Sequence, residues 1–161
     1  MTPPNEWANR STLITGGAGF IGSNLARRLV SMGAQVRLVD NLERGRMGYI
    51  EPVIDRVEFV ECDLRDLSAT RSVMQDIAVV FHLASKVGSI QVYINQPSTI
   101  LSDNLRIDQN VFQSALGAGV PSLFYASSAH VYPANRQQSP DAPPLHETDA
   151  YPAAPGLTYG W

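Results

Sequence analysis

The chain has 161 residues and a formal net charge of −3, with 44% hydrophobic and 17% charged residues. This composition is typical of a globular protein. The net negative charge excludes the strongly basic composition that is typical of a nucleic-acid-binding protein. No apolar run is long enough to span a membrane, and the first ten residues lack the apolar core of a signal peptide, so we expect a cytoplasmic protein without a membrane partner.

The first predicted element is a β-branched strand at residues 12–15, which breaks into glycines spaced three apart. A helical pattern over residues 20–32 follows, with Gly33 as its stop signal. Glycine permits a positive φ and a close backbone approach, and a helix N-terminus attracts a phosphate. The context therefore predicts a dinucleotide-binding turn rather than a plain strand-to-helix turn. The candidate cofactor-binding residues of this turn are Gly16, Gly19, Phe20, Ile21 and Gly22.

A second strand at residues 35–39 leads to Asp40, 18 positions after the last of these glycines. A carboxylate at this place can accept both ribose hydroxyls of an adenosine and would repel a 2′-phosphate, which favours NAD over NADP. The alternative is a turn role, because Asp40 and Asn41 are good turn formers. Arg44 and Arg46 lie close enough in sequence to leave NADP open. We take Asp40 and Asn41 as candidate cofactor-binding residues.

The remaining chain alternates predicted strands and helices. Near-continuous apolar strands between helices indicate a parallel sheet covered on both faces, and right-handed crossovers make it doubly wound. We therefore predict an α/β, Rossmann-like domain over residues 1–161, with the ligand at the carboxyl ends of the strands. Six of the eleven prolines fall in 133–157, which predicts a long irregular loop. The further strands are expected at 57–60, 77–83 and 122–126, and the helices at 66–76 and 97–118.

Polar residues follow several of these strands and one lies inside the long helix. Asp63 either accepts from an adenine amine or caps the helix that begins near Asp66. We interpret His82 as structural. Asn104 either holds backbone near the site or faces solvent. The candidate cofactor-binding residues of this group are Asp63, Leu64, Leu83, Ala84, Ser85 and Asn104.

Cysteine and histidine are scarce. Cys62 is the single cysteine of the chain, so it cannot form an internal disulfide, and it fits a reducing compartment. We expect it to pack at a strand end. With three scattered histidines, the chain shows no metal-ligand spacing, and no metal site is predicted.

Several motifs occur in an order that resembles a known family. They are TGGAGFIG at 15–22, LVDN at 38–41, CDLRD at 62–66, HLAS at 82–85, YASSAHVYP at 125–133 and TYG at 158–160. Together they resemble the extended short-chain dehydrogenases/reductases, the NAD-dependent epimerase and dehydratase family that acts on nucleotide sugars. The resemblance implies a Rossmann fold with tightly held NAD, a nucleotide-sugar substrate and a homodimer. It also implies that Ser128 is the catalytic serine and Tyr159 the catalytic tyrosine.

Within this family, SSAHVYP and residues 147–160 look most like the GDP-mannose 3,5-epimerases. Those enzymes place an acid/base cysteine where this chain has His130, and imidazole also transfers protons near neutral pH. The resemblance implies epimerisation through a keto sugar, with transient hydride transfer to NAD. A dehydratase or another oxidoreductase of the family is the alternative, although Ala129 and His130 are not the acidic pair usual in dehydratases. A noncatalytic NAD- or nucleotide-binding module is the alternative from another class.

The family activates its tyrosine with a lysine four residues later, but this sequence ends at Trp161 and its single lysine is Lys86. We therefore expect the cofactor-binding part of a longer enzyme, truncated after the fifth strand, without the C-terminal substrate region and inactive alone. We also expect an uncovered fifth strand and an apolar helix face that make this chain self-associate. The helix face is predicted to contain Leu105, Val111 and Phe112.

Overall fold

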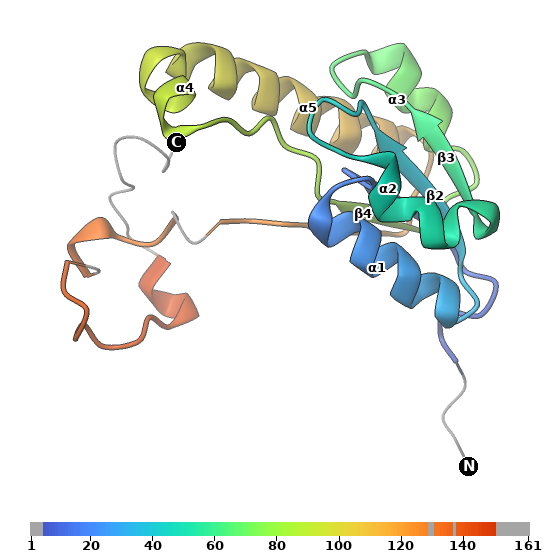
Figure 1. Ribbon diagram of the computed structural model, residues 1–161, viewed down its shortest axis with the longest axis horizontal. Helices are drawn as coiled ribbons and strands as arrows, with labels where there is room; N and C mark the ends of the chain where they lie inside the picture. Colours follow the sequence, from blue (N-terminus) through green and yellow to red (C-terminus); the bar gives the residue numbers. More distant parts are fainter. Residues whose placement is uncertain (1–4, 129–130, 137, 151–161) are drawn as a thin grey trace. The chain divides into compact units, whose positions relative to one another are not determined.

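The computed structural model describes residues 5–128, 131–136 and 138–150 (Figure 1). The chain divides into two compact units, which are described separately. The first unit combines residues 1–85 with 103–126, and the second combines residues 86–102 with 127–161. Within the described ranges, no helix is long and apolar enough to cross a membrane.

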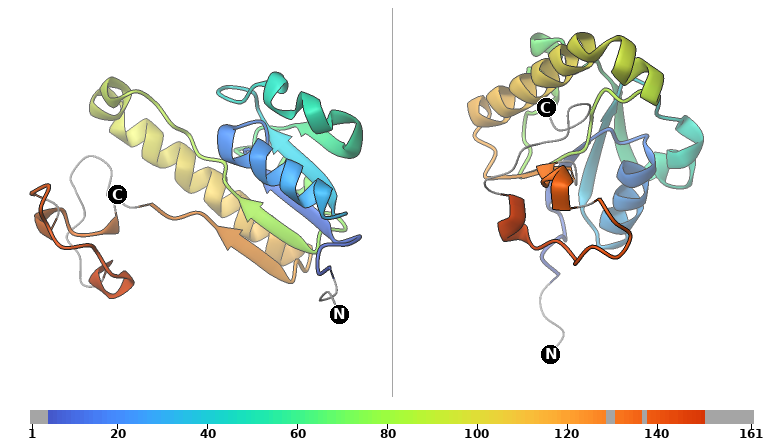
Figure 2. Two further views of the ribbon diagram at one scale, coloured as in Figure 1. Left: turned by 60° about the horizontal axis from the view of Figure 1, so that its bottom comes forward. Right: turned by 90° about the vertical axis from the view of Figure 1, so that its left-hand side faces the viewer.

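The first unit is built on five parallel strands in the spatial order β3-β2-β1-β4-β5. The chain runs outward from β1 through β2 to β3, and then crosses to the other side of β1 for β4 and β5 (Figure 2). Strand order reverses between β1 and β4, which is where a doubly wound sheet binds its ligand. The predicted fold class is confirmed. The strands are β1 (Ser11–Thr15), β2 (Gln35–Asp40), β3 (Val57–Glu61), β4 (Val79–His82) and β5 (Ser122–Tyr125).

Helices cover both faces of this sheet (Figures 1 and 2). Side chains alternate along a strand, so the consecutive residues Leu13 and Ile14 enter two different cores. One core contains Ile14 with residues of α1 and the 3-10 helix η1, and the other contains Leu13 with residues of α3 and α5. The elements are α1 (Phe20–Ser31), α2 (Met47–Ile50), η1 (Glu51–Arg56), α3 (Leu67–Val73) and α5 (Pro97–Gly117).

Two glycines end the long helices. Gly33 has φ +80°, and its N–H donates to Val30 O. Gly119 has φ +70°, and its N–H donates to Leu116 O in the same way. A left-handed residue after a helix lets the chain satisfy the last carbonyls, which explains why the predicted helix ends are accurate. The predicted helix at 66–76 is shorter in the structure, because α3 ends at Val73.

Phe20 and Ile21, which fit the apolar period of α1, are exposed at its first turn. One expectation about an apolar helix residue needs correction. Val111 was expected on an exposed face of α5, but it is fully buried against the sheet. Leu105 and Phe112 are exposed, as predicted.

The described part of the second unit includes α4 (Ile90–Asn95), the start of α5 and the 3-10 helices η3 (Ala134–Arg136) and η4 (Glu147–Ala150). The sequence analysis did not predict α4, which has only six residues, none of them buried, although Ile90, Tyr93 and Ile94 follow helical spacing. The described part of the predicted loop at 133–157 is largely irregular, apart from η3 and η4.

Candidate cofactor site

The glycine loop between β1 and α1 is packed too tightly for side chains. Gly16 has φ +67°, and a Cβ there would lie 3.1 Å from the backbone N of Ala84. A Cβ on Gly22 would lie 2.3 Å from the carbonyl oxygen of Gly16. Gly19 is the N-cap of α1 and provides no side-chain cap. The N-terminus of a 12-residue helix therefore faces the loop without a capping side chain, which suits a phosphate.

Asp40 lies at the carboxyl end of β2 and is 9% exposed. Its Oδ2 accepts from the N–H of Ala18 in the glycine loop at 3.0 Å, and its Oδ1 accepts from the N–H of Leu42 at 2.9 Å. A Cβ on Gly45 would lie 2.6 Å from Asp40 Oδ1, so the chain also passes close to the carboxylate here. The bond to Leu42 is the expected turn interaction of Asp40. Together with the bond to Ala18, it holds the carboxylate beside the glycine loop. The ribose role stays a prediction.

The residues after Asp40 form a polar turn. The side-chain oxygen of Asn41 accepts from the N–H of Glu43 at 3.1 Å, which is a turn contact. Arg44 and Arg46 are exposed, and the backbone N–H of Arg46 donates to Ala18 O. This second contact with Ala18 ties the turn to the glycine loop.

The carboxyl end of β4 is fixed by one threonine. The hydroxyl oxygen of Thr15 accepts from the N–H of Leu83 and from the N–H of Ala84, both at 3.1 Å. Farther along, the hydroxyl of Ser85 donates to the side-chain oxygen of Asn104 on α5 at 3.0 Å. Two predicted site residues are therefore in direct contact through their side chains, and the role of Asn104 in holding backbone near the site stays a prediction.

The segment after β3 shows that Asp63 does not cap α3. The cap of α3 is Asp66, whose side chain accepts from the N–H groups of Ser68 and Ala69. Asp63 instead pairs with Arg65, which also binds Asp103 on α5 at 2.9 Å. The hydrogen bond to Asp63, with a further contribution from Asp103, raises the pKa of the Arg65 guanidinium. The capping interpretation of Asp63 is therefore wrong, and the adenine role stays a prediction.

Leu64 and Cys62 flank Asp63 and are both buried. The carbonyl oxygen of Leu64 accepts from the Nδ2 of the buried Asn110 on α5 at 2.8 Å. Cys62 packs just after β3, as expected. Its burial and the nearby charge of Asp63 raise the pKa of its thiol.

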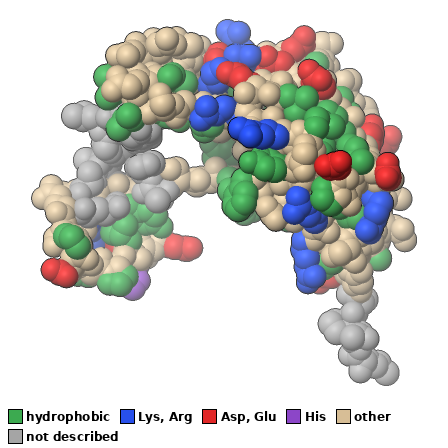
Figure 3. All heavy atoms as spheres, viewed as in Figure 1, with side chains coloured by type: hydrophobic (Ala, Val, Ile, Leu, Met, Phe, Trp, Pro, Cys, Tyr) green, Lys and Arg blue, Asp and Glu red, His purple; other side chains and the backbone are tan. Residues whose placement is uncertain are grey.

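Phe20 and Ile21 are 76% and 67% exposed at the start of α1. Figure 3 shows hydrophobic side chains on the surface at this end of α1. Large apolar side chains beside an anion-binding helix end are suited to cover a bound molecule of mixed polarity. Their exposure is consistent with the predicted cofactor contact.

Of the predicted catalytic residues, the structure describes only Ser128. Ser128 lies in the second unit, three residues after β5, and is exposed. His130 and Tyr159 lie outside the described residues. Within the part of the chain that is described, no group of three His, Cys, Asp or Glu side chains could hold a metal ion.

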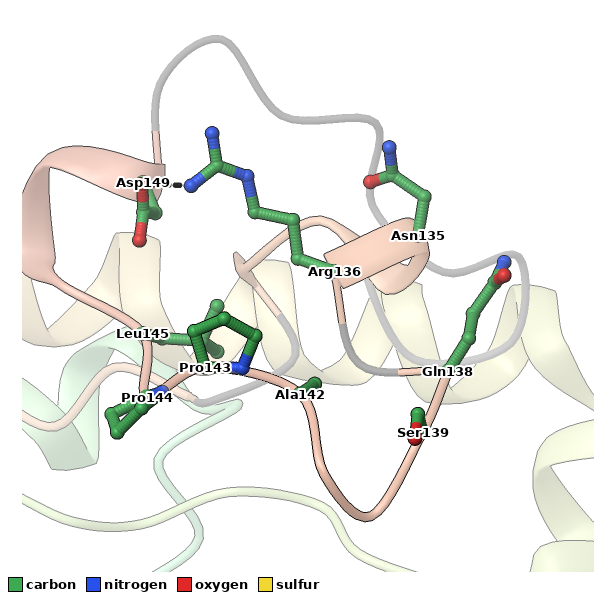
Figure 4. A pocket seen from close by; sticks show the side chains of 9 residues that line it. All are labelled: Asn135, Arg136, Gln138, Ser139, Ala142, Pro143, Pro144, Leu145 and Asp149. Atoms are coloured by element: carbon green, nitrogen blue, oxygen red, sulfur yellow. Dashed lines mark hydrogen bonds and ion pairs between the residues drawn. The ribbon is translucent and has the colours of Figure 1, made fainter.

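The second unit also contains a pocket of about 380 Å³ (Figure 4). Arg136 pairs with Asp149 at this pocket (Figure 4). The backbone N–H of His146 and the charge of Arg136 lower the pKa of the Asp149 carboxyl. Pro143, Pro144 and Leu145 supply apolar lining. The sequence analysis assigned no site to this segment, because an irregular loop has no periodicity that would reveal a pocket.

Sequence reasoning also missed several residues that shape the cofactor site. Thr15 and Ala18 hold β4 and Asp40 in place, and a Cβ on Gly17 would lie 2.8 Å from Leu38 Cβ. Thr15 directly precedes the first glycine, but a buried strand threonine carries no pattern that distinguishes it from a packing residue. Arg65 next to two aspartates was a visible charge cluster, but only the fold brings Asp103 to it.

Comparison with known proteins gives consistent results. Residues 12–159 match the NAD dependent epimerase/dehydratase family. The GDP-mannose 3,5-epimerase of Arabidopsis thaliana is 35% identical over 157 residues, which are 98% of this chain and 40% of that protein. A UDP-N-acetyl-alpha-D-glucosaminuronate decarboxylase of Bacillus cytotoxicus is 33% identical over 85% of this chain and 40% of its own length.

Solved structures agree with these sequence matches. The UDP-glucose 4-epimerase of Thermus thermophilus, solved as a complex with NAD, superposes with a TM-score of 0.79 and 29% identity. That alignment covers 93% of this chain and 46% of the neighbour. The chain thus spans less than half the length of the relatives it matches, and it corresponds to their N-terminal, NAD-binding portion. On this evidence the chain belongs to the NAD-dependent epimerase/dehydratase family.

Proposed function

We propose that this chain is the NAD-binding part of a nucleotide-sugar epimerase. The observation that carries the proposal is the position of the Asp40 carboxylate, which contacts Ala18 of the glycine loop at the carboxyl end of β2. A carboxylate in this position is suited to accept the ribose hydroxyls, and the helix N-terminus beside it is suited to a pyrophosphate, which supports the proposal. NAD held by these residues would supply the hydride-transfer chemistry of the reaction.

Each part of the site has a proposed task. The glycine loop and the first turn of α1 bind the pyrophosphate, and Asp40 with Asn41 recognises the adenosine ribose. Asp63 and Leu64 recognise the adenine. The segment of Leu83, Ala84 and Ser85, held by Thr15 and Asn104, lies along the nicotinamide half.

The catalytic assignments rest on the family resemblance. Tyr159 removes the proton of the reacting hydroxyl, and a phenol needs a nearby positive charge for this because its ordinary pKa is about 10. Ser128 orients that hydroxyl by hydrogen bonding. His130 exchanges the proton on the ring carbon, which suits an imidazole near neutral pH.

We further propose that the 161-residue chain binds NAD without turning over a nucleotide sugar. The matched region covers only 35–46% of the relatives, so most of each relative lies outside it. The proposed partners are a nucleotide-sugar substrate and, in the complete enzyme, a second copy of the chain. The exposed Leu105, Phe112 and Leu116 on α5 support this homodimer proposal. We place the enzyme in the cytoplasm, because the single cysteine of this chain fits a reducing compartment.

Calorimetric titration of the chain with NAD and with NADP tests the cofactor assignment. We expect binding of NAD and weaker binding of NADP; a preference for NADP would contradict the role of Asp40. Product analysis by chromatography with GDP-mannose and UDP-sugars tests the second claim, and robust turnover by this chain would overturn it. A chain that binds no dinucleotide would contradict the proposal as a whole.

A further inference from the structure

A network of hydrogen bonds joins β1, β4, β5 and α5 near the candidate cofactor site. The His82 ring, which is 1% exposed at the end of β4, contacts the Thr15 hydroxyl through Nδ1 at 2.7 Å and Asp108 Oδ1 through Nε2 at 3.0 Å. The other oxygen of Asp108 accepts from the Tyr125 hydroxyl at 2.9 Å. This hydrogen-bond network thus connects α5 and β5 to β1.

The proton positions in this network follow from the number of donors and acceptors at the Thr15 hydroxyl. A hydroxyl has one proton and two lone pairs, and the Thr15 oxygen accepts from the N–H groups of Leu83 and Ala84. With both lone pairs occupied, Thr15 donates its proton to His82 Nδ1. Nδ1 therefore carries no proton, and the ring is the tautomer with its proton on Nε2, which donates to Asp108.

This network ends at the cofactor site. Thr15 precedes the glycine loop, and the two N–H groups that it holds belong to the segment that passes the loop. The approach is close, because a Cβ on Gly16 would lie 3.1 Å from the N and Cα of Ala84. A change in the Leu83–Ala84 backbone would therefore change the wall of the glycine loop.

We infer that His82 is a positioning residue: as the Nε2–H tautomer it holds the Thr15 hydroxyl in the orientation that fixes Leu83 and Ala84 against the glycine loop. The inference extends the structural role predicted for His82 to the cofactor site. It rests on the proposed function in so far as that site binds NAD.

Two substitutions test this inference in the 161-residue chain. Thr15→Val keeps the shape and removes the hydroxyl, and Thr15→Ser restores it. The matched control is Thr12→Val, because Thr12 is equally buried on the same strand and its hydroxyl donates to Gln35 O at 3.2 Å instead. We expect Thr15→Val to weaken NAD binding about tenfold and Thr15→Ser to recover it, since unpaired buried donors are costly. Equal losses for Thr15→Val and Thr12→Val would overturn the inference.

The tautomer is tested without NAD. A long-range proton–nitrogen NMR spectrum should show His82 with an unprotonated Nδ1 and a protonated Nε2. Amide hydrogen exchange at Leu83 and Ala84 should accelerate in Thr15→Val and stay unchanged in Thr12→Val. A proton on Nδ1 would overturn the inference even where NAD binds. A chain that fails to bind NAD but shows the expected spectrum would overturn the proposed function and leave the hydrogen-bond network established.

Discussion

The Asp40 carboxylate and the backbone N–H of Ala18 are hydrogen-bonded, with 3.0 Å between Oδ2 and N. This bond joins the end of β2 to the glycine loop that precedes α1. The loop conformation and the position of the carboxylate therefore depend on each other. A substitution at Asp40 should affect both the recognition of ribose and the shape of the phosphate site.

We predict that Asp40→Asn binds NAD about tenfold more weakly and loses most of its preference over NADP. The amide keeps the size of the side chain, but removes the charge that repels a 2′-phosphate and strengthens bonds to hydroxyls. Calorimetric titration with both dinucleotides gives the two affinities. The control is Glu61→Gln, which removes one charge from the residue that pairs with Asp40 in the β2–β3 register. An NADP affinity that rises equally in both variants would assign the effect to net charge.

A second prediction concerns the packing of α1 on the glycine loop. Gly22→Ala should destabilise the fold by about 1–3 kcal/mol, because the added Cβ would meet backbone atoms that cannot move aside. The closest of these is the carbonyl oxygen of Gly16 at 2.3 Å. Thermal unfolding measures the loss. Gly48→Ala in α2 is the control, since nothing lies within 4 Å of its Cβ; similar midpoints for the two variants would contradict the packing argument.

The sequence was sufficient for the first βαβ unit because its signals are local. Gly16 and Gly33 take positive φ, which glycine adopts without steric cost, and both strands carry β-branched and apolar residues at their buried positions. The roles of Asp63 and Asp66 could not be separated in this way, since either aspartate is a suitable cap by type. The choice depends on Arg65, which engages Asp63 and Asp103 together, and that pairing exists only after α5 has packed.

The same limit explains the error at Val111, which was expected on an exposed face of α5 and is fully buried. Val111 and Phe112 are adjacent in sequence, and a rotation of α5 by one residue decides which of them meets the sheet. The sequence shows that one face is apolar, but the packing of α5 against Leu13 and Val80 sets the angle.

A third prediction concerns alkaline pH. Burial and the hydrogen bond to Asp108 raise the pKa of the Tyr125 phenol, whereas in the unfolded chain it is about 10. The folded state therefore holds this proton more tightly. The resulting stabilisation is complete below the unfolded pKa and is lost as pH rises through the folded pKa.

Tyr125→Phe should therefore remove part of the stability loss above about pH 10. It should also remove from the ultraviolet absorbance a phenolate that forms above the ordinary phenol pKa of about 10. Tyr49→Phe is the matched control for both measurements, because Tyr49 on α2 is exposed to a similar degree. A phenolate titration in which Tyr125 ionises no later than the other tyrosines would contradict the prediction.

The last prediction concerns association. β5 is an edge strand of the described sheet, with Phe124 and Tyr125 exposed, and α5 exposes Leu105, Phe112 and Leu116. The exposed fraction of Leu116 is 84%. A sheet edge with unpaired backbone groups and an apolar helix face both favour contact with another chain. We therefore expect the 161-residue chain to self-associate at micromolar concentration, which sedimentation velocity across a concentration series measures.

Charge placed on the helix face should separate these two routes to association. Leu116→Glu, alone or with Leu105→Glu, is expected to shift the chain toward monomer, because a carboxylate in an apolar contact must lose its hydration. Gln35→Glu adds the same charge at an exposed residue at the start of β2 and is the control. If the double variant still associates, the contact surface is the edge of β5 and not the face of α5. A parent chain that stays monomeric at all concentrations would contradict the prediction, and would favour a self-contained nucleotide-binding module over the dimeric enzyme.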